Sequence, residues 1–237
     1  MIDGGEEGAT GRPGRLRAAI LADGDAPDRA ELDAAWPGWD DGLAFVVAAD
    51  GGARHAAGLG VRIDRWVGDG DSLPAAELEA LRAAGIPVDL VAAEKDETDT
   101  ELALRAALDA GATDVVILGA FGGPRLDHAL ANAGLLAHPA LVGRRAQLID
   151  RGSRVRLVRG RATLALDGRA GDLVSLIPFG VDAEGVTTHG LRYPLRRETL
   201  ALGTARGVSN VRVGEHASVA VDGGAVLVVE TPVTLSR

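Results

Sequence analysis

The chain has 237 residues, of which 46% are hydrophobic and 25% charged, which is enough apolar material for one large domain or two small ones. Its 25 basic and 34 acidic residues give a net charge of −9, which argues against nucleic-acid binding through bulk phosphate attraction. The absence of cysteine excludes a disulfide framework, a thiolate zinc site and a cysteine nucleophile. Lys95 is the one lysine among the basic residues; all the others are arginine.

The first residues are acidic and rich in glycine, unlike the basic and then apolar pattern of a signal peptide. No stretch approaches the roughly 20 apolar residues that a membrane-spanning helix needs. The sequence therefore predicts a cytoplasmic protein with neither a membrane nor a nucleic acid as partner. Residues 1–14 are expected to form a flexible tail.

Between residues 15 and 145, short apolar runs alternate with helix-length segments, which predicts an α/β domain with a mainly parallel sheet covered on both faces. One helix is expected from Pro74 to near Ala84. Another is expected from Thr98, which begins a capping-box pattern, to Gly111. The expected strands are Arg17–Ala22, Ala44–Ala49, Arg65–Val67, Val88–Val91 and Val115–Leu118.

Residues 146–237 have a different pattern, in which short β-type runs are separated by turns rich in glycine and charge. This spacing predicts an all-β sandwich domain after the α/β domain. The expected strands are Gln147–Ile149, Val155–Val158, Thr163–Leu166, Leu173–Ile177, Ser218–Val221 and Val226–Val229.

Polar residues follow four of the predicted parallel strands, at the sheet edge where ligands of open α/β sheets bind. In chain order these segments are Asp50-Gly51-Gly52, Gly68-Asp69-Gly70-Asp71-Ser72, Lys95-Asp96-Glu97-Thr98-Asp99 and Gly122-Gly123-Pro124-Arg125-Leu126-Asp127-His128. Each segment alone has an ordinary interpretation as a turn or a helix cap. Their convergence on one edge favours a functional site.

Polyphosphate chemistry fits these residue types. Asp69, Asp71 and Asp99 repel one another unless a cation lies between them, and Mg²⁺ prefers such oxygen ligands. Lys95 and Arg125 are candidates for contacts to phosphate oxygens, and the glycine pairs let backbone N–H groups approach closely. A Walker A loop is excluded because the one lysine does not follow a glycine.

As a set, these motifs closely resemble those of thiamine pyrophosphokinases. The resemblance rests on Asp50-Gly51-Gly52-Ala53, Gly68-Asp69-x-Asp71-Ser72, Lys95-Asp96-x-Thr98-Asp99 and Gly122-Gly123-x-Arg125-Leu126-Asp127-His128 with Asn132. The segments Gly190–Leu195 and Gly207–Asn210 are similar to C-terminal elements of that family. Two departures are Gly70, where the family usually has a larger apolar residue, and the additional Pro124 before Arg125.

The resemblance implies a homodimer that transfers the pyrophosphoryl group of ATP to the hydroxyl of thiamine, giving thiamine diphosphate and AMP. It matches Asp69, Asp71 and Asp99 to the magnesium ligands. It matches Ser209 and Asn210 to the segment that lines the thiamine site near the dimer interface. The residues expected around the nucleotide and its phosphates are Asp50, Gly51, Gly52, Lys95, Thr98, Arg125, Asp127, His128 and Asn132.

The expected reaction is an in-line attack of the thiamine hydroxyl on the β-phosphorus of ATP. The expected catalytic residues are Asp71, Asp99, Lys95 and Arg125, with Asp71 or Asp99 as candidate acceptor of the hydroxyl proton. Thiamine is a cationic aromatic molecule, so Tyr193 is the candidate aromatic contact.

Two alternatives stay open at this point. One is a pyrophosphokinase of another alcohol, such as a hydroxymethylpterin, which a substrate panel distinguishes. The other is a non-catalytic nucleotide-binding relative, which would bind ATP without producing AMP.

Overall fold

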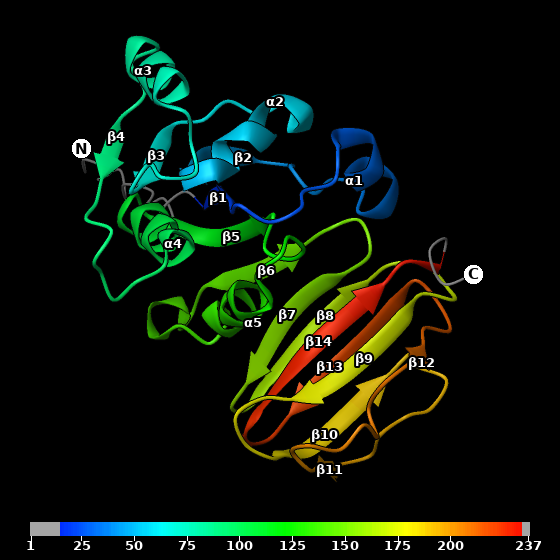
Figure 1. Ribbon diagram of the computed structural model, residues 1–237. Helices are drawn as coiled ribbons and strands as arrows, with labels where there is room; N and C mark the ends of the chain where they lie inside the picture. Colours follow the sequence, from blue (N-terminus) through cyan, green and yellow to red (C-terminus); the bar gives the residue numbers. More distant parts are fainter. Residues whose placement is uncertain (1–14, 234–237) are drawn as a thin grey trace, which may run out of the picture.

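The computed structural model describes residues 15–233, so the expected tail at residues 1–14 lies outside the described residues. It contains an α/β region followed by a β region, shown in Figure 1 from blue to red. This arrangement confirms the predicted fold class. None of the helices in residues 15–233 is long and apolar enough to cross a membrane.

The α/β region is a parallel sheet in the order β6-β5-β1-β2-β3-β4 with helices on both faces (Figure 1). Helices α4 and α5 pack on one face, and α1, α2 and α3 on the other. Ile20 and Leu21 of β1 point into these two different cores, as the alternation of side chains along a strand requires. The strands are β1 (Leu16–Leu21), β2 (Leu43–Ala49), β3 (Arg65–Gly68), β4 (Val88–Leu90), β5 (Ala112–Leu118) and β6 (Arg145–Ile149).

The two predicted helices, α3 and α4, begin and end close to where the sequence predicts. Thr98 caps α4 by accepting a hydrogen bond from the backbone N–H of Glu101, and Pro74 immediately precedes α3. Asp28 and Glu31 form a complete capping box at α1, a helix that the sequence analysis did not predict. The helical segments are α1 (Arg29–Ala35), η1 (Asp50–Arg54), α2 (His55–Leu59), α3 (Ala75–Ala83), α4 (Asp99–Asp109), α5 (Leu126–Leu135) and η2 (Pro139–Leu141).

The β region continues the same sheet. Strand β6 pairs in parallel with β5 and antiparallel with β7, and the sheet then runs through β14, β9 and β12. A second sheet, in the order β11-β10-β13-β8, packs against this extension around a separate apolar core. The strands are β7 (Arg154–Arg159), β8 (Ala162–Asp167), β9 (Leu173–Pro178), β10 (Ala183–His189), β11 (Glu198–Leu200), β12 (Asn210–Val211), β13 (His216–Val221) and β14 (Ala225–Thr231).

The strands predicted from the sequence differ from the structure in two respects. The sequence analysis grouped residues 147–149 with the β region, whereas they belong to β6, which joins the two halves of the ten-stranded sheet. It also missed β10, β11 and β12. Strand β10 contains Gly185, which has a φ of 63° and interrupts the alternating pattern that identifies strands.

Candidate active site

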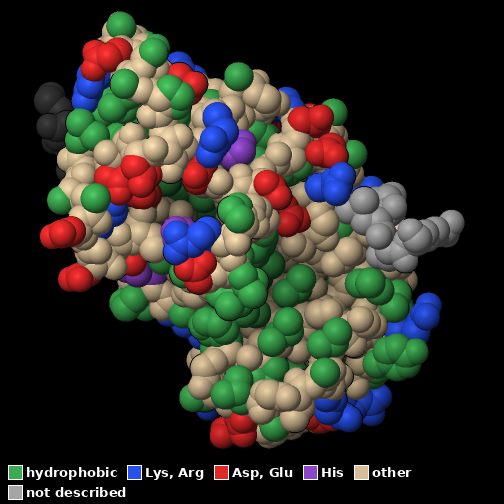
Figure 2. All heavy atoms as spheres, viewed as in Figure 1, with side chains coloured by type: hydrophobic (Ala, Val, Ile, Leu, Met, Phe, Trp, Pro, Cys, Tyr) green, Lys and Arg blue, Asp and Glu red, His purple; other side chains and the backbone are tan. Residues whose placement is uncertain are grey.

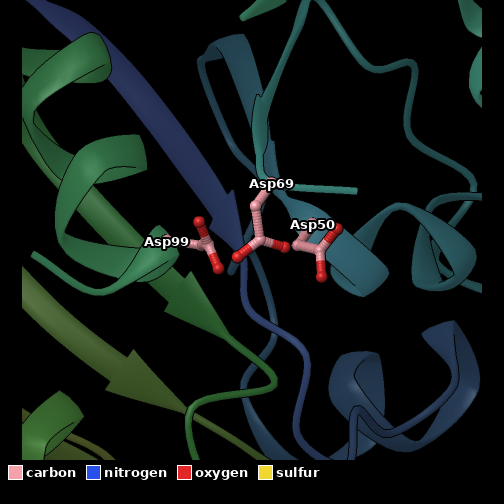
Figure 3. Close-up of side chains that lie close together, drawn as sticks. All are labelled: Asp50, Asp69 and Asp99. Atoms are coloured by element: carbon pink, nitrogen blue, oxygen red, sulfur yellow. The ribbon is translucent and has the colours of Figure 1, made fainter. Parts of the chain in front are cut away.

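Three aspartates from different strand ends gather at the carboxyl edge of the parallel sheet. Asp50 follows β2, Asp69 follows β3, and Asp99 begins α4 after β4. Figure 3 shows their side chains lying close together, and ligand oxygens of the three lie within 4.8 Å of one another. We call this group the carboxylate triad. Such a group needs a nearby positive charge, because like charges at this separation repel strongly.

Asp50 is the buried member of the triad, with 3% of its surface exposed. Its backbone has a φ of 43°, and the indole N–H of Trp66 donates to its carbonyl oxygen over 3.0 Å. A Cβ atom on Gly68 would lie 2.8 Å from the Asp50 Cβ, so only glycine leaves room for this packing.

The carboxylate of Asp50 is incompletely paired. Its Oδ2 accepts a hydrogen bond of 3.3 Å from the backbone N–H of Ser72, while its Oδ1 is buried without a hydrogen-bond partner among residues 15–233. Burial raises the pKa of Asp50, because the charged form loses its hydration. An unpartnered buried oxygen on a carboxylate grouped with two other aspartates fits a cation ligand.

Lys95 supplies the positive charge that the triad has from its own chain. Its Nζ lies 3.1 Å from Asp69 Oδ2 and 3.1 Å from Asp99 Oδ1. Burial lowers the pKa of Lys95, but its bonds to Asp99 and Asp69 outweigh that effect and leave the pKa raised. Burial raises the pKa of Asp99 despite this ion pair. The hydrogen bond from the Asp71 N–H and the contact with Lys95 lower the pKa of Asp69.

Asp71 lies beside the triad rather than within it. Its backbone N–H donates to Asp69 Oδ1 over 3.1 Å, and its own carboxylate accepts a hydrogen bond of 2.9 Å from the Ser72 hydroxyl. Its exposed side chain lines the same cleft. The assignment of Asp71 as a metal ligand or proton acceptor stays a prediction, and Asp50 occupies the third triad position.

The cleft beside the triad has a volume of about 570 Å³ and extends to the residues after β5. It brings together most of the residues predicted for the nucleotide. These lining residues are Asp50, Lys95, Thr98, Arg125, His128 and Asn132, with the glycines Gly122 and Gly123.

The segment after β5 is held in place by hydrogen bonds to the rest of the site. Asp25 Oδ2 accepts from the N–H of Gly123 over 3.2 Å, and the buried amide of Asn132 donates to the Ala120 carbonyl over 2.9 Å. Arg125 forms an ion pair with Asp127 at 2.6 Å, which lowers the pKa of Asp127 to about 2. Both side chains of that pair are exposed.

Gly51 and Gly52 serve the packing of the strand ends. A Cβ atom on Gly52 would lie 2.0 Å from the Leu21 carbonyl oxygen, and one on Gly51 would lie 2.4 Å from Asp23 Oδ1. Their small size therefore lets the segment after β2 pack directly against the end of β1. A role of these two glycines in nucleotide binding stays a prediction.

The residues predicted for thiamine lie in the β region, which has a separate pocket of about 390 Å³. Tyr193 and Asn210 line this pocket, and the side chain of Tyr193 is exposed. The Asn210 side chain accepts from the Tyr193 N–H over 3.0 Å and donates to the Tyr193 carbonyl over 2.7 Å. Ser209 has a φ of 60°, and its backbone N–H donates to the Ser175 hydroxyl. Asn210 thus fixes the backbone that presents Tyr193.

Comparison with known proteins covers both regions. Residues 40–148 match the family model "Thiamin pyrophosphokinase, catalytic domain", and residues 162–226 match "Thiamin pyrophosphokinase, vitamin B1 binding domain". Thiamine pyrophosphokinase from Bacillus subtilis (strain 168) is 30% identical over 174 residues, which cover 73% of this chain and 80% of the relative. The chain belongs to the thiamine pyrophosphokinase family.

Solved structures of the thiamine pyrophosphokinase family share the fold of this chain. The structure of the Bacillus subtilis enzyme superposes with a TM-score of 0.79 at 26% identity, covering 91% of this chain and 99% of that one. A thiamin pyrophosphokinase family protein from Enterococcus faecalis superposes with a TM-score of 0.76 at 27% identity, covering 91% and 98% of the two chains.

Site residues that follow β1 were missed by the sequence analysis. Asp23 lines the cleft beside the triad and pairs with Arg54, and Asp25 holds the loop after β5. The signal was present, because Asp23-Gly24-Asp25 follows the first predicted strand as similar segments follow the others. The imidazole of His55 forms a further hydrogen bond of 2.9 Å with the Gly24 carbonyl, and burial lowers its pKa.

Proposed function

We propose that this chain is a thiamine diphosphokinase, which transfers the pyrophosphoryl group of ATP to the hydroxyl of thiamine and releases AMP. The observation that carries this proposal is the match of both regions to thiamine pyrophosphokinase domains, with the carboxylate triad and Lys95 inside the catalytic part. The chemistry of the cleft is consistent with this function, because phosphoryl transfer depends mainly on positioning the substrates and stabilising negative charge.

The donor set of the triad fits Mg²⁺. Three carboxylates lie within 4.8 Å of one another, and Asp50 Oδ1 is a buried oxygen without a partner in the described part of the chain. Asp50, Asp69 and Asp99 would hold the ion, with Asp71 as a neighbouring carboxylate of the same loop. When bound, Mg²⁺ neutralises charge on the phosphate oxygens.

The other residues of the cleft bind and orient the nucleotide. Lys95 places an ammonium at the floor of the cleft, where negative charge develops on the leaving AMP and the transferred group. Arg125 contributes a planar guanidinium at the other end, and Asp127 holds its orientation. Thr98 fixes the start of α4 and hence the position of Asp99.

Two features of the β region support a homodimer with thiamine bound between subunits. The pocket around Tyr193 and Asn210 shares no lining residue with the cleft of the triad. Figure 2 shows hydrophobic side chains gathered on the surface of the β region. The large apolar side chains exposed there are Ile177, Val181, Tyr193, Leu202, Val208 and Val213. A second copy of the chain would cover these apolar side chains. The cytoplasmic location stays a prediction.

Product analysis tests the function. The purified chain is incubated with ATP, Mg²⁺ and either thiamine or a hydroxymethylpterin, and the products are identified by mass spectrometry. We expect thiamine diphosphate and no pterin diphosphate. Formation of pterin diphosphate alone would favour the other pyrophosphokinase, and nucleotide binding without any product would favour the non-catalytic relative.

A further inference from the structure

Lys95 lies where a cation would bind the carboxylate triad. It lies in the segment between β4 and α4, and its side chain is 14% exposed. Its Nζ contacts one oxygen of Asp69 and one of Asp99, each over 3.1 Å. The ammonium is therefore seated between two of the three carboxylates that would hold a divalent cation.

Two other oxygens of the triad already accept hydrogen bonds from backbone N–H groups. Asp69 Oδ1 accepts the N–H of Asp71, so the oxygen of Asp69 that contacts Lys95 is the one without a backbone partner. Asp50 Oδ2 is engaged by Ser72, which leaves Oδ1. A cation that binds Asp69 Oδ2 and Asp99 Oδ1 competes for the two oxygens that the ammonium already contacts.

Charge makes the two cations mutually exclusive at this place. An ammonium and a divalent ion bound to the same carboxylate oxygens would repel each other strongly in a half-buried site. Lysine has a flexible four-carbon stem, so its ammonium can leave the triad while its backbone stays in place. In the proposed function, the phosphates of the nucleotide offer the released ammonium a new partner.

We propose that Lys95 is an internal counter-ion of the carboxylate triad, which a divalent cation displaces and thereby frees for contact with phosphate. The inference rests on the proposed function for the identity of the phosphate. It makes cation binding weak in the absence of nucleotide, because the cation must break two ion pairs. It also makes cation and nucleotide binding mutually favourable, since each supplies a partner that the other step requires.

The composition of the chain allows a direct test without any substitution. Lys95 is the only lysine, so limited acetylation modifies one side chain, and the α-amino group of the chain serves as an internal reference. Mg²⁺ is added without nucleotide, and the rate of Lys95 acetylation is followed by mass spectrometry. We expect this rate to rise at least about threefold relative to the reference, because the amine leaves two ion pairs. An unchanged relative rate at saturating Mg²⁺ would overturn the inference.

Substitutions provide an independent test through cation affinity. In Lys95→Met the stem remains and the charge is lost, so we expect Mg²⁺ binding, measured by titration calorimetry without nucleotide, to tighten at least about tenfold. Arg105→Met is the matched control. It removes a positive charge from α4 that pairs with Glu97 and Glu101 instead of the triad, and its affinity is expected to stay within about twofold.

The outcomes separate the inference from the function on which it rests. If Lys95→Met is folded by circular dichroism and binds Mg²⁺ no more tightly than the unsubstituted chain, the inference is wrong even when thiamine diphosphate is formed. If the unsubstituted chain forms no thiamine diphosphate, the proposed function is wrong. In that case the Mg²⁺ affinities and the acetylation rate of Lys95 still show whether Mg²⁺ displaces its ammonium from the triad.

Discussion

Two ion clusters of opposite composition lie in the two regions of the molecule. In the α/β region, one lysine pairs with two of three clustered carboxylates beside an open cleft. In the β region, three arginines surround one buried glutamate, Glu230, which is 1% exposed. The ion pairs of this second cluster are Arg154–Glu230 at 2.9 Å, Arg156–Glu230 at 2.5 Å and Arg212–Glu230 at 2.7 Å.

The two clusters differ in how completely their charged groups are paired. In the β region, further N–H groups of the arginines donate to backbone carbonyls, including those of Leu166 and Asp167, although the Nε atoms of Arg156 and Arg212 lack partners. Burial raises the pKa of Glu230, but its pairs with Arg154 and Arg156 outweigh this and hold the pKa low. The triad instead contains a buried carboxylate oxygen, Asp50 Oδ1, without a hydrogen-bond partner among residues 15–233, beside an open cleft. We therefore call the Glu230 cluster the closed cluster and expect it to stabilise the fold. We call the carboxylate triad with Lys95 the open cluster and expect it to bind a ligand.

The largest expected effect is on the closed cluster. Glu230→Gln leaves three arginines without their counter-charge, and we expect it to lower the free energy of unfolding by about 3–5 kcal/mol. Urea denaturation measures this. Glu198→Gln is the control, because Glu198 pairs with Arg206 at the surface and should contribute only about 0–1 kcal/mol. Equal losses in the two variants would contradict a structural role for the Glu230 cluster.

The Glu230 cluster also predicts a pH dependence of stability. The pKa of Glu230 in the folded chain lies below its ordinary value of 4.5, so its stabilising contribution is complete above pH 4.5 and is lost as the pH falls through the folded pKa. The free energy of unfolding should therefore fall more steeply below pH 4.5 in the unsubstituted chain than in Glu230→Gln. Parallel pH profiles of the two chains would contradict the assignment.

The open cluster is expected to respond in the opposite way. Asp50→Asn removes a buried charge that lacks a full set of partners, so we expect stability without Mg²⁺ to rise by about 0.5–2 kcal/mol. Turnover should fall at least about a hundredfold, since a preorganised charge of the site is lost. Thermal unfolding and AMP release measure the two effects. A variant that is destabilised and still active would show that Asp50 serves the fold alone.

Asp71→Asn separates the two candidate ligand sets. If the carboxylate of Asp71 binds the ion, its loss should reduce turnover about as much as that of Asp50, at least about a hundredfold. If Asp71 is only a neighbour of the triad, turnover should stay within about tenfold. The measurement is AMP release at saturating thiamine, ATP and Mg²⁺.

A smaller effect is expected at Lys95. Lys95→Arg keeps the charge but replaces a compact ammonium by a wide planar group, so the fold should survive and turnover should fall about 10- to 100-fold. The comparison is with Arg105→Lys, an exchange on α4 outside the triad that should leave turnover nearly unchanged. Full activity of Lys95→Arg would show that only the sign of the charge matters.

The smallest predicted effect on turnover concerns the pocket of the β region. Asn210→Ala removes two hydrogen bonds to the backbone of Tyr193, which should cost about 1–3 kcal/mol of stability. It should also raise KM for thiamine more than KM for ATP. Thr204→Ala, which removes an exposed hydrogen bond in a neighbouring loop, is the control. Equal increases of both KM values would place Asn210 outside the thiamine site.

The sequence predicted what depends on local patterns. Thr98 caps α4 as expected, and the polar segments after β2, β3, β4 and β5 meet at one edge because parallel strands place their carboxyl ends together. The third member of the triad was not predictable in this way. The inward position of Asp50 depends on a positive φ and on close packing against Gly68, which no local pattern reveals.

Features that depend on contacts between distant parts of the chain also could not be predicted from the sequence pattern. The continuation of the sheet through β6 depends on pairing with both β5 and β7, which lie on either side of it. The Glu230 cluster joins residues from β7, β14 and the segment after β12, and charged residues in strands usually indicate a solvent-facing side. Only the folded chain shows that these arginines pair with one buried glutamate.

The most direct test of the account follows the α-phosphorus of ATP through the reaction. ATP radiolabelled at this position is incubated with thiamine and either the unsubstituted chain or Asp69→Asn, with Mg²⁺ or with a chelator. The account predicts labelled AMP, formed in step with thiamine diphosphate, only with the unsubstituted chain and Mg²⁺. Labelled ADP with thiamine monophosphate, or undiminished AMP formation by Asp69→Asn, would contradict pyrophosphoryl transfer at the carboxylate triad.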